Sequence, residues 1–261
     1  MMIGRLRSAT CLIRSPGRDL RTHILVGPKL KQGVLERSVL IVRSIASILI
    51  LILTAAVSAA AAVDGNKLEP IGALTDAGAP EAVRSALEAK GYRVTGSDGS
   101  VICELWLRSQ IPPQEKKEVA GAIYPELGDS TLIGVVSLPK GGNDFRGQGI
   151  KPGLYTLRYA VHPTDGNHMG ISPYRDFLLL VPAAMDTEVG AKPKFEELSK
   201  LSAKAAGTNH PTPFSLVSVE GIKSFPSVSE DDHGRVVFAA KVKTSTGDLP
   251  IAFIVRGVAE Q

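Results

Sequence analysis

The segment that decides the fold is VICELWLR, residues 101–108. Its odd-numbered residues are all apolar, whereas Glu104 and Arg108 put charge on the even-numbered side. Because successive side chains of a strand point to opposite faces, this period of two predicts a β-strand with one face in the core. Cys103 is expected on the buried face, as a small apolar residue and not as a nucleophile.

Five further segments have the composition of strands: residues 131–138, 154–162, 177–181, 235–243 and 250–256. Two of them, 131–138 and 177–181, are apolar on both faces, as central strands are. The turn Thr246-Gly247-Asp248 joins the last two into a C-terminal hairpin. Strict alternation of strands with helices is missing, which disfavours a parallel sheet.

Two short segments have helical signals. Residues 80–90 begin with Pro80 in the first turn and are followed by Gly91, and residues 194–206 are followed by Gly207. Proline at the start and glycine past the end are typical of helix boundaries. The sequence therefore predicts a mainly β fold, an antiparallel β-sandwich of six to eight strands with two short accessory helices.

Charge divides the chain at residue 63. The whole sequence carries +4, but residues 1–63 contain nine of its 30 basic and two of its 26 acidic residues. The remaining 21 basic and 24 acidic residues give residues 64–261 a net charge of about −3. A nucleic-acid binder is therefore not expected, because its affinity depends on clustered Lys and Arg.

The basic N-terminal part ends in IASILILILTAAVSAAAAV, residues 45–63, which has no charged residue. Arg37 and Arg43, the branched apolar run and the small residues that follow have the layout of a secretory signal. An uncleaved membrane anchor is the alternative, and either would place residues 64–261 outside the cytoplasm, in the periplasm or secreted. Residues 1–36 fit neither role, and we expect a non-structural or wrongly translated extension upstream of the true start. We thus expect three parts: a non-structural or wrongly translated extension at 1–36, a signal peptide or membrane anchor at 37–63, and one exported domain at 64–261.

One loop carries the candidate site residues. HPTDGNHMGISPYRD, residues 162–176, connects two predicted strands and contains two histidines. Polar groups that could converge on a ligand are His162, Asp165, Asn167, His168, Arg175 and Asp176. Two imidazoles and a carboxylate suit a divalent metal, which His162, His168 and Asp165 would hold. The alternative is a structural turn, since Asp165-Gly166-Asn167 is explained by backbone geometry alone.

Other candidates have simpler explanations. Trp106, Tyr155 and Tyr159 could form a sugar-stacking platform, but the two tyrosines share a face with apolar residues and are expected in the core. His210 lies in a linker-like segment between Asn209 and Pro211. Nucleophile-elbow, H-E-x-x-H, C-x-x-C and phosphate-loop motifs do not occur in the sequence.

Three pieces in order carry a resemblance: GLYTLRY at 153–159, DGNHMG at 165–170 and RDFLLLVP at 175–182. Together they resemble a group of uncharacterised exported β-rich proteins of environmental bacteria, over roughly residues 91–183. The resemblance implies a secreted β-rich domain and transfers no activity and no catalytic residue.

These observations predict an exported binding or structural module that recognises a small molecule, a glycan or a protein through loops at one end of the fold, where 162–176 and 139–150 lie. No cofactor is expected, and the membrane is contacted only through the N-terminal segment if that segment is uncleaved. Two alternatives stay open. One is a metal-dependent hydrolase that uses the 162–176 loop, and the other is a carbohydrate-binding module.

Overall fold

The computed structural model describes residues 65–114, 119–163, 172 and 174–259, all within the compact unit Ala62–Gln261. The main strands are β1 (Lys67–Gly72), β2 (Lys90–Thr95), β3 (Val101–Leu107), β4 (Leu132–Leu138), β7 (Gly153–Val161), β8 (Asp176–Pro182), β9 (Pro213–Val217), β10 (Ser227–Glu230), β11 (Val236–Thr244) and β12 (Gly247–Arg256). Shorter elements are β5 (Gly142–Asn143), β6 (Gly149–Ile150), the helices α2 (Glu81–Ser85) and α3 (Phe195–Ala206), and the 3-10 turn η1 (Ala183–Met185).

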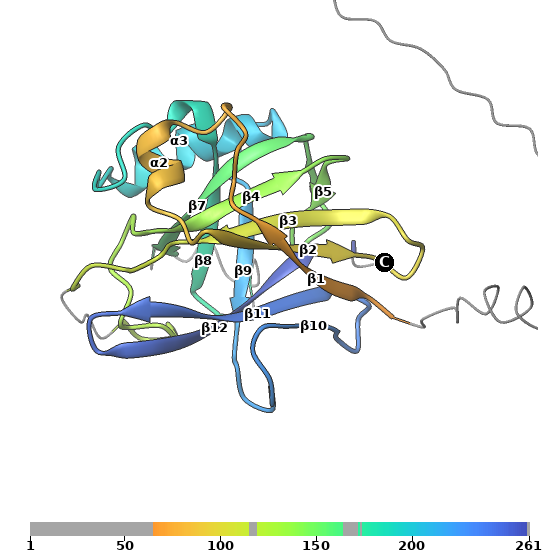
Figure 1. Ribbon diagram of the computed structural model, residues 1–261. Coiled ribbons are helices and arrows are strands. Elements are labelled where there is room, and N and C mark those ends of the chain that lie inside the picture. The colour runs from red at the N-terminus through yellow and green to blue at the C-terminus, as the bar shows by residue number, and fades with distance from the viewer. Residues whose placement is uncertain (1–64, 115–118, 164–171, 173, 260–261) are drawn as a thin grey trace, which may run out of the picture. The chain divides into compact units, whose positions relative to one another are not determined.

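Ten strands form one antiparallel sheet in the order β1-β2-β3-β4-β7-β8-β9-β12-β11-β10 (Figure 1). The sheet curls until its two edge strands lie near each other, and Asn66 Nδ2 donates a hydrogen bond of 3.2 Å to Glu230 Oε2 across this seam. Across the interior, the rings of Tyr92 in β2 and Phe238 in β11 are 5.6 Å apart. The expected mainly β, antiparallel class with two short helices is confirmed, but one nearly closed sheet replaces two clearly separate layers.

The interior of the sheet is a packed apolar core. One side of every long strand contributes to it, including the predicted inward residues Cys103, Leu105 and Leu107. Burying such side chains stabilises the fold by about 25 cal/mol per Å² of apolar surface. Cys103 is fully buried, as the alternation of its strand predicts, and it is a free thiol within the described residues.

Smaller apolar clusters cover the outer faces of the sheet. Helix α3 packs Leu198 with the partly buried Phe195 and Leu201 on Phe177 and Leu179 of β8. This helix ends where the sequence predicts, at Gly207, whose φ of 73° places it in the left-handed region that glycine adopts readily.

The helix predicted over residues 80–90 is shorter than expected. It ends at Ser85, because Leu87 forms an antiparallel bridge with Arg108 and Glu88 N donates to Leu107 O at 2.9 Å. Gly91 lies inside β2 and is not a helix stop. A Cβ at that position would lie 2.5 Å from Trp106 Nε1, so close packing against Trp106 explains this glycine.

Candidate ligand-binding pocket

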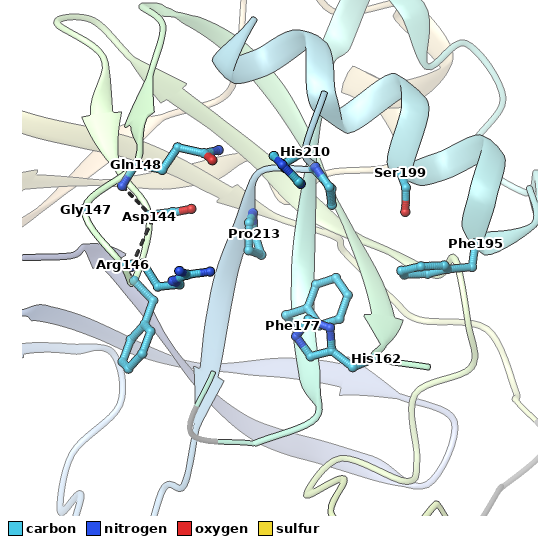
Figure 2. Close-up of a pocket in the computed structure, with 12 residues that line it drawn as sticks. Asp144, Arg146, Gly147, Gln148, His162, Phe177, Phe195, Ser199, His210 and Pro213 are labelled. Carbon is cyan, nitrogen blue, oxygen red and sulfur yellow. Dashed lines mark hydrogen bonds between the residues drawn. The ribbon is translucent and has the colours of Figure 1, made fainter. Parts of the chain in front are cut away.

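A cavity of about 600 Å³ lies between α3, the strands β8 and β9, and the loop between β5 and β6 (Figure 2). It is lined by residues 144–148, His162, Phe177, Phe195, Ser199, His210, Pro211 and Pro213. These residues come from five separate segments of the sequence. The volume is in the range of cavities that bind small molecules.

Asp144 builds the loop that forms one wall. Its Oδ1 accepts hydrogen bonds from the amides of Arg146 (3.0 Å) and Gln148 (2.8 Å), and its carbonyl accepts one from Gly147 N (2.9 Å). Gly147 has a φ of 82°, which this tight turn requires. Burial raises the pKa of the Asp144 carboxyl above its ordinary value. The loop is therefore held in one conformation by its own first residue.

The same loop is fixed to the end of β12. Gly257 N donates to Asn143 O at 3.1 Å, and a Cβ added to Gly257 would lie only 1.7 Å from Asp144 O. Phe145 packs on the outer face of β11 and β12, and Arg235 Cζ lies 4.4 Å from the centroid of its ring. The wall of the cavity is thus supported by residues that lie 90 or more positions further along the chain.

Aromatic rings form the apolar part of the lining. The rings of His162 and Phe177 have their centroids 4.1 Å apart, and Phe195 meets Phe177 edge-on at 6.3 Å. In Figure 2 the Phe195 ring reaches from α3 toward the cavity. Pro211 and Pro213 add apolar surface beside them. This part of the cavity can hold a flat apolar group.

The polar part of the lining has unused hydrogen-bonding groups. Gln148 Nε2 and Ser199 Oγ are buried, yet neither has a hydrogen-bond partner within the described part of the chain. The exposed Arg146 extends its guanidinium inward from the loop (Figure 2), where its charge interacts with the carboxylate of Asp144 two residues before it. Buried polar groups are normally satisfied, so such groups mark a place where a ligand or water binds.

Of the six residues predicted to bind a ligand, the cavity includes His162. Asp176 is fully buried, and its carboxylate accepts hydrogen bonds from Ile123 N (2.8 Å), Tyr124 N (2.7 Å) and Tyr159 Oη (3.2 Å). Its role in the structure is to hold the segment around residue 123 against β7 and β8. No signal in the sequence pairs these positions, which are about 50 residues apart.

Arg175 also binds backbone. Its Nη1 donates to Ala120 O at 2.8 Å and its Nη2 donates to His162 O. Arg175 and Asp176 therefore hold residues 120–124 in place through hydrogen bonds, and they do not line the cavity. The other three predicted residues, Asp165, Asn167 and His168, lie outside the described residues, and their role in binding stays a prediction.

The metal hypothesis rests largely on those same residues. Within residues 65–114, 119–163, 172 and 174–259, no three His, Cys, Asp or Glu side chains are grouped closely enough to hold a metal ion. Two of the three predicted ligands, Asp165 and His168, lie outside these ranges. A metal site formed with His162 thus stays a prediction.

The three aromatic residues form no sugar-stacking platform, and Tyr155 and Tyr159 lie in the core as the sequence predicts. Trp106, Tyr155 and Tyr159 are only 5%, 4% and 1% exposed. Trp106 Nε1 donates to Gly72 O at 2.9 Å and Tyr155 Oη donates to Lys151 O at 2.7 Å, so their polar atoms serve the fold. These rings are unable to stack on a sugar.

Sequence reasoning missed most of the cavity. It treated His210 as part of a linker, and it named residues 139–150 as a recognition loop without singling out any residue within them. The signal in DFRGQG, residues 144–149, is an aspartate followed three residues later by glycine, which predicts a tight side-chain-stabilised turn. Phe195 and Ser199 have the i, i+4 spacing of one helix face, but nothing local shows that this face is hollow.

No protein-family model matches the chain, and no curated protein and no solved structure is significantly similar to it. The case for a function therefore depends on the geometry of the cavity. Within the described residues, neither helix has the length and apolar character needed to cross a membrane.

Proposed function

We propose that this chain is an exported binding protein that holds a small molecule in the cavity between α3, β8 and the 144–148 loop. The observation that carries the proposal is the combination of a cavity of about 600 Å³ with buried, unpartnered polar atoms on Gln148 and Ser199. Ligand sites in proteins are typically concave and mostly apolar, with a few polar groups that orient the ligand.

The supports of the cavity favour binding to a preformed site. Phe177 belongs to β8, near the middle of the sheet, and α3 is fixed to the same sheet by Leu198. At its C-terminal end, α3 is tied to the start of β9 by Ser202 Oγ, which accepts a hydrogen bond of 2.9 Å from Thr212 N. A site on such rigid elements loses little conformational entropy when its ligand binds.

Location is part of the same proposal. The apolar segment 45–63 with Arg37 and Arg43 before it supports export, and so does the resemblance to exported β-rich proteins. The two halves of the curved sheet face each other across one core, so the sheet that carries the site is sandwich-like. The loops that form the cavity lie on the outside of this sheet, as in many binding modules.

A cavity-filling substitution tests the proposal. Ser199→Trp would fill the cavity, whereas Lys200→Trp places the same side chain on an exposed position of the same helix. Ligand-observed NMR with three naphthalene probes (2-naphthoate, 2-naphthamide and 2-naphthylmethylamine) should detect at least one bound to the wild-type chain. That binding should persist in Lys200→Trp and disappear in Ser199→Trp.

Two results would overturn the proposal. One is that no probe binds the wild-type chain. The other is that Ser199→Trp binds as well as Lys200→Trp, which would place the bound probe elsewhere. Circular dichroism melting of both variants shows whether α3 and the sheet are intact, so that a loss of binding is not confused with unfolding.

A further inference from the structure

We infer that the ligand of this cavity is an aromatic carboxylate, with its ring among Phe177, Phe195 and the prolines and its carboxylate against Arg146 and Gln148. The inference rests on the proposed binding function and names the chemical class that the lining selects.

The unused polar groups of the cavity are mainly donors. Arg146 offers a guanidinium with five N–H donors in a planar fork, and Gln148 Nε2 is a buried donor without a partner in the described residues. Asp144, which lines the same cavity, already accepts two backbone amides at its Oδ1, at 2.8 and 3.0 Å. A ligand that brings acceptor oxygens would therefore give Gln148 Nε2 a partner and accept hydrogen bonds from the fork of Arg146.

The shape of the donor set favours a carboxylate. A guanidinium binds a carboxylate through two parallel hydrogen bonds, which fixes both distance and orientation. A phosphate dianion would satisfy the same fork. It would, however, bring a second negative charge close to Asp144, which lines the same cavity two residues before Arg146. The lining thus discriminates in favour of a single negative charge.

The apolar half of the cavity selects the rest of the ligand. Phe177 and Phe195 meet edge-on at 6.3 Å, and the His162 ring lies against Phe177 at 4.1 Å. Figure 2 shows Arg146 on the loop side of the cavity and Phe195 on the helix side, with Pro213 between them. A flat ring placed against the aromatic side directs a substituent toward the loop. Aromatic contacts of this kind favour a ring over an aliphatic chain.

Three probes that differ only in the polar group test this assignment. Isothermal titration of the full chain should give tightest binding for 2-naphthoate, weaker binding for 2-naphthamide and weakest binding for 2-naphthylmethylamine. Arg146→Gln should weaken 2-naphthoate by about ten- to a hundredfold, the size of one charged hydrogen-bonding interaction, and leave 2-naphthamide nearly unchanged. Arg146→Lys should restore part of the loss, because it keeps the charge and removes the fork.

Lys67→Gln is the matched control. It removes one positive charge from an exposed position on the edge strand β1, five strands away from β8 in the sheet order, and should leave all three affinities unchanged. Equal affinities for the three probes would overturn the carboxylate inference and leave the binding function standing. Tightest binding of the amine, or of 2-naphthyl phosphate added as a fourth probe, would overturn it as well. Failure of every probe on the wild-type chain would instead reject the binding function itself.

Discussion

Arg158 and Asp186 form a two-point ion pair in the interior, with Nε–Oδ2 and Nη2–Oδ1 distances of 2.7 Å. Arg158 is 1% exposed, and its remaining donors bind the carbonyls of Ser130, Glu188 and Ala191. One side chain of β7 therefore organises the whole segment between β8 and α3, and so fixes the position from which α3 begins.

Removing this arginine should be costly. Arg158→Met leaves the Asp186 carboxylate buried without its cation, and the free energy of unfolding should fall by about 3–5 kcal/mol. Urea denaturation measures the change. The control is Arg93→Gln, which breaks the surface ion pair between Arg93 Nη2 and Glu104 Oε1, 2.7 Å apart, whose side chains are 42% and 21% exposed. This change should lower the free energy of unfolding by less than about 1 kcal/mol. Similar losses in both variants would contradict this account.

Gly257→Ala should disturb the wall of the cavity. The new methyl group would lie 1.7 Å from Asp144 O, so the 144–148 loop or the end of β12 must move. Overpacking of this kind costs about 1–3 kcal/mol, and amide chemical shifts should change mainly around Asp144. Gly72→Ala is the control, because a Cβ there has no atom within 4 Å. Unchanged shifts in Gly257→Ala would show that the loop is not seated on this glycine.

Tyr124 should make the fold sensitive to alkali. Burial raises the pKa of its hydroxyl from the ordinary value of 10 to about 12. The unfolded chain ionises first, so this group's contribution to stability is complete below pH 10 and is lost between pH 10 and 12. A shift of this size corresponds to about 2–3 kcal/mol. Denaturation at a series of pH values measures the loss.

Tyr124→Phe provides the control for this titration. It should remove the part of the stability loss at high pH that comes from Tyr124. A part that comes from Tyr159 should stay, because burial and the nearby Asp176 also raise the pKa of Tyr159. It should also cost about 1–3 kcal/mol at neutral pH, because Ala252 N then loses the acceptor that lies at 3.0 Å. A wild-type stability that is flat from pH 9 to about 12 would contradict the assignment.

Cys103 should be chemically inert in the folded chain. Burial raises the pKa of its thiol well above the ordinary value, so the reactive thiolate is scarce. In a chain carrying Cys11→Ser, where Cys103 is the single thiol, a disulfide reagent should react only after denaturant is added. Rapid labelling without denaturant would show that β3 opens readily.

The metal hypothesis has its own test. We expect less than a stoichiometric amount of divalent metal in the purified chain and no change in Tm on chelation. The physical reason is that the ring of His162, one of the three predicted ligands, packs on Phe177. Stoichiometric metal that is lost in both His162→Ala and His168→Ala would instead support the hydrolase alternative.

The sequence pattern predicted most of the long strands. It found β3, β7 and the hairpin of β11 and β12 from apolar residues at every second position, and β4 and β8 from continuous apolar runs. It missed β1, whose sequence KLEPIG has no buried residue and contains a proline on an edge strand. It also missed β9, which is only five residues long and begins at Pro213.

The periodicity of apolar residues does not predict that the sheet is nearly closed. An alternating strand fits a two-layer sandwich as well as a curved sheet, since both bury one face. The difference lies in which strands become neighbours, here β9 with β12, and that pairing joins residues more than 30 positions apart. The cavity escaped prediction for a similar reason, because Arg146, Phe195 and His210 come together only through the packing of α3.

Because the 144–148 loop packs on Gly257, the cavity can form only after the ribosome has added that residue. A growing chain can form the aromatic side of the cavity once β8 and α3 have been made, but the loop has no place to rest until Gly257 has been added. A product truncated before that residue would keep the rings and lose the wall that presents Arg146. The ability to hold a ligand should therefore appear only after β12 and Gly257 have been made, and ligand binding would report whether the hairpin of β11 and β12 is intact.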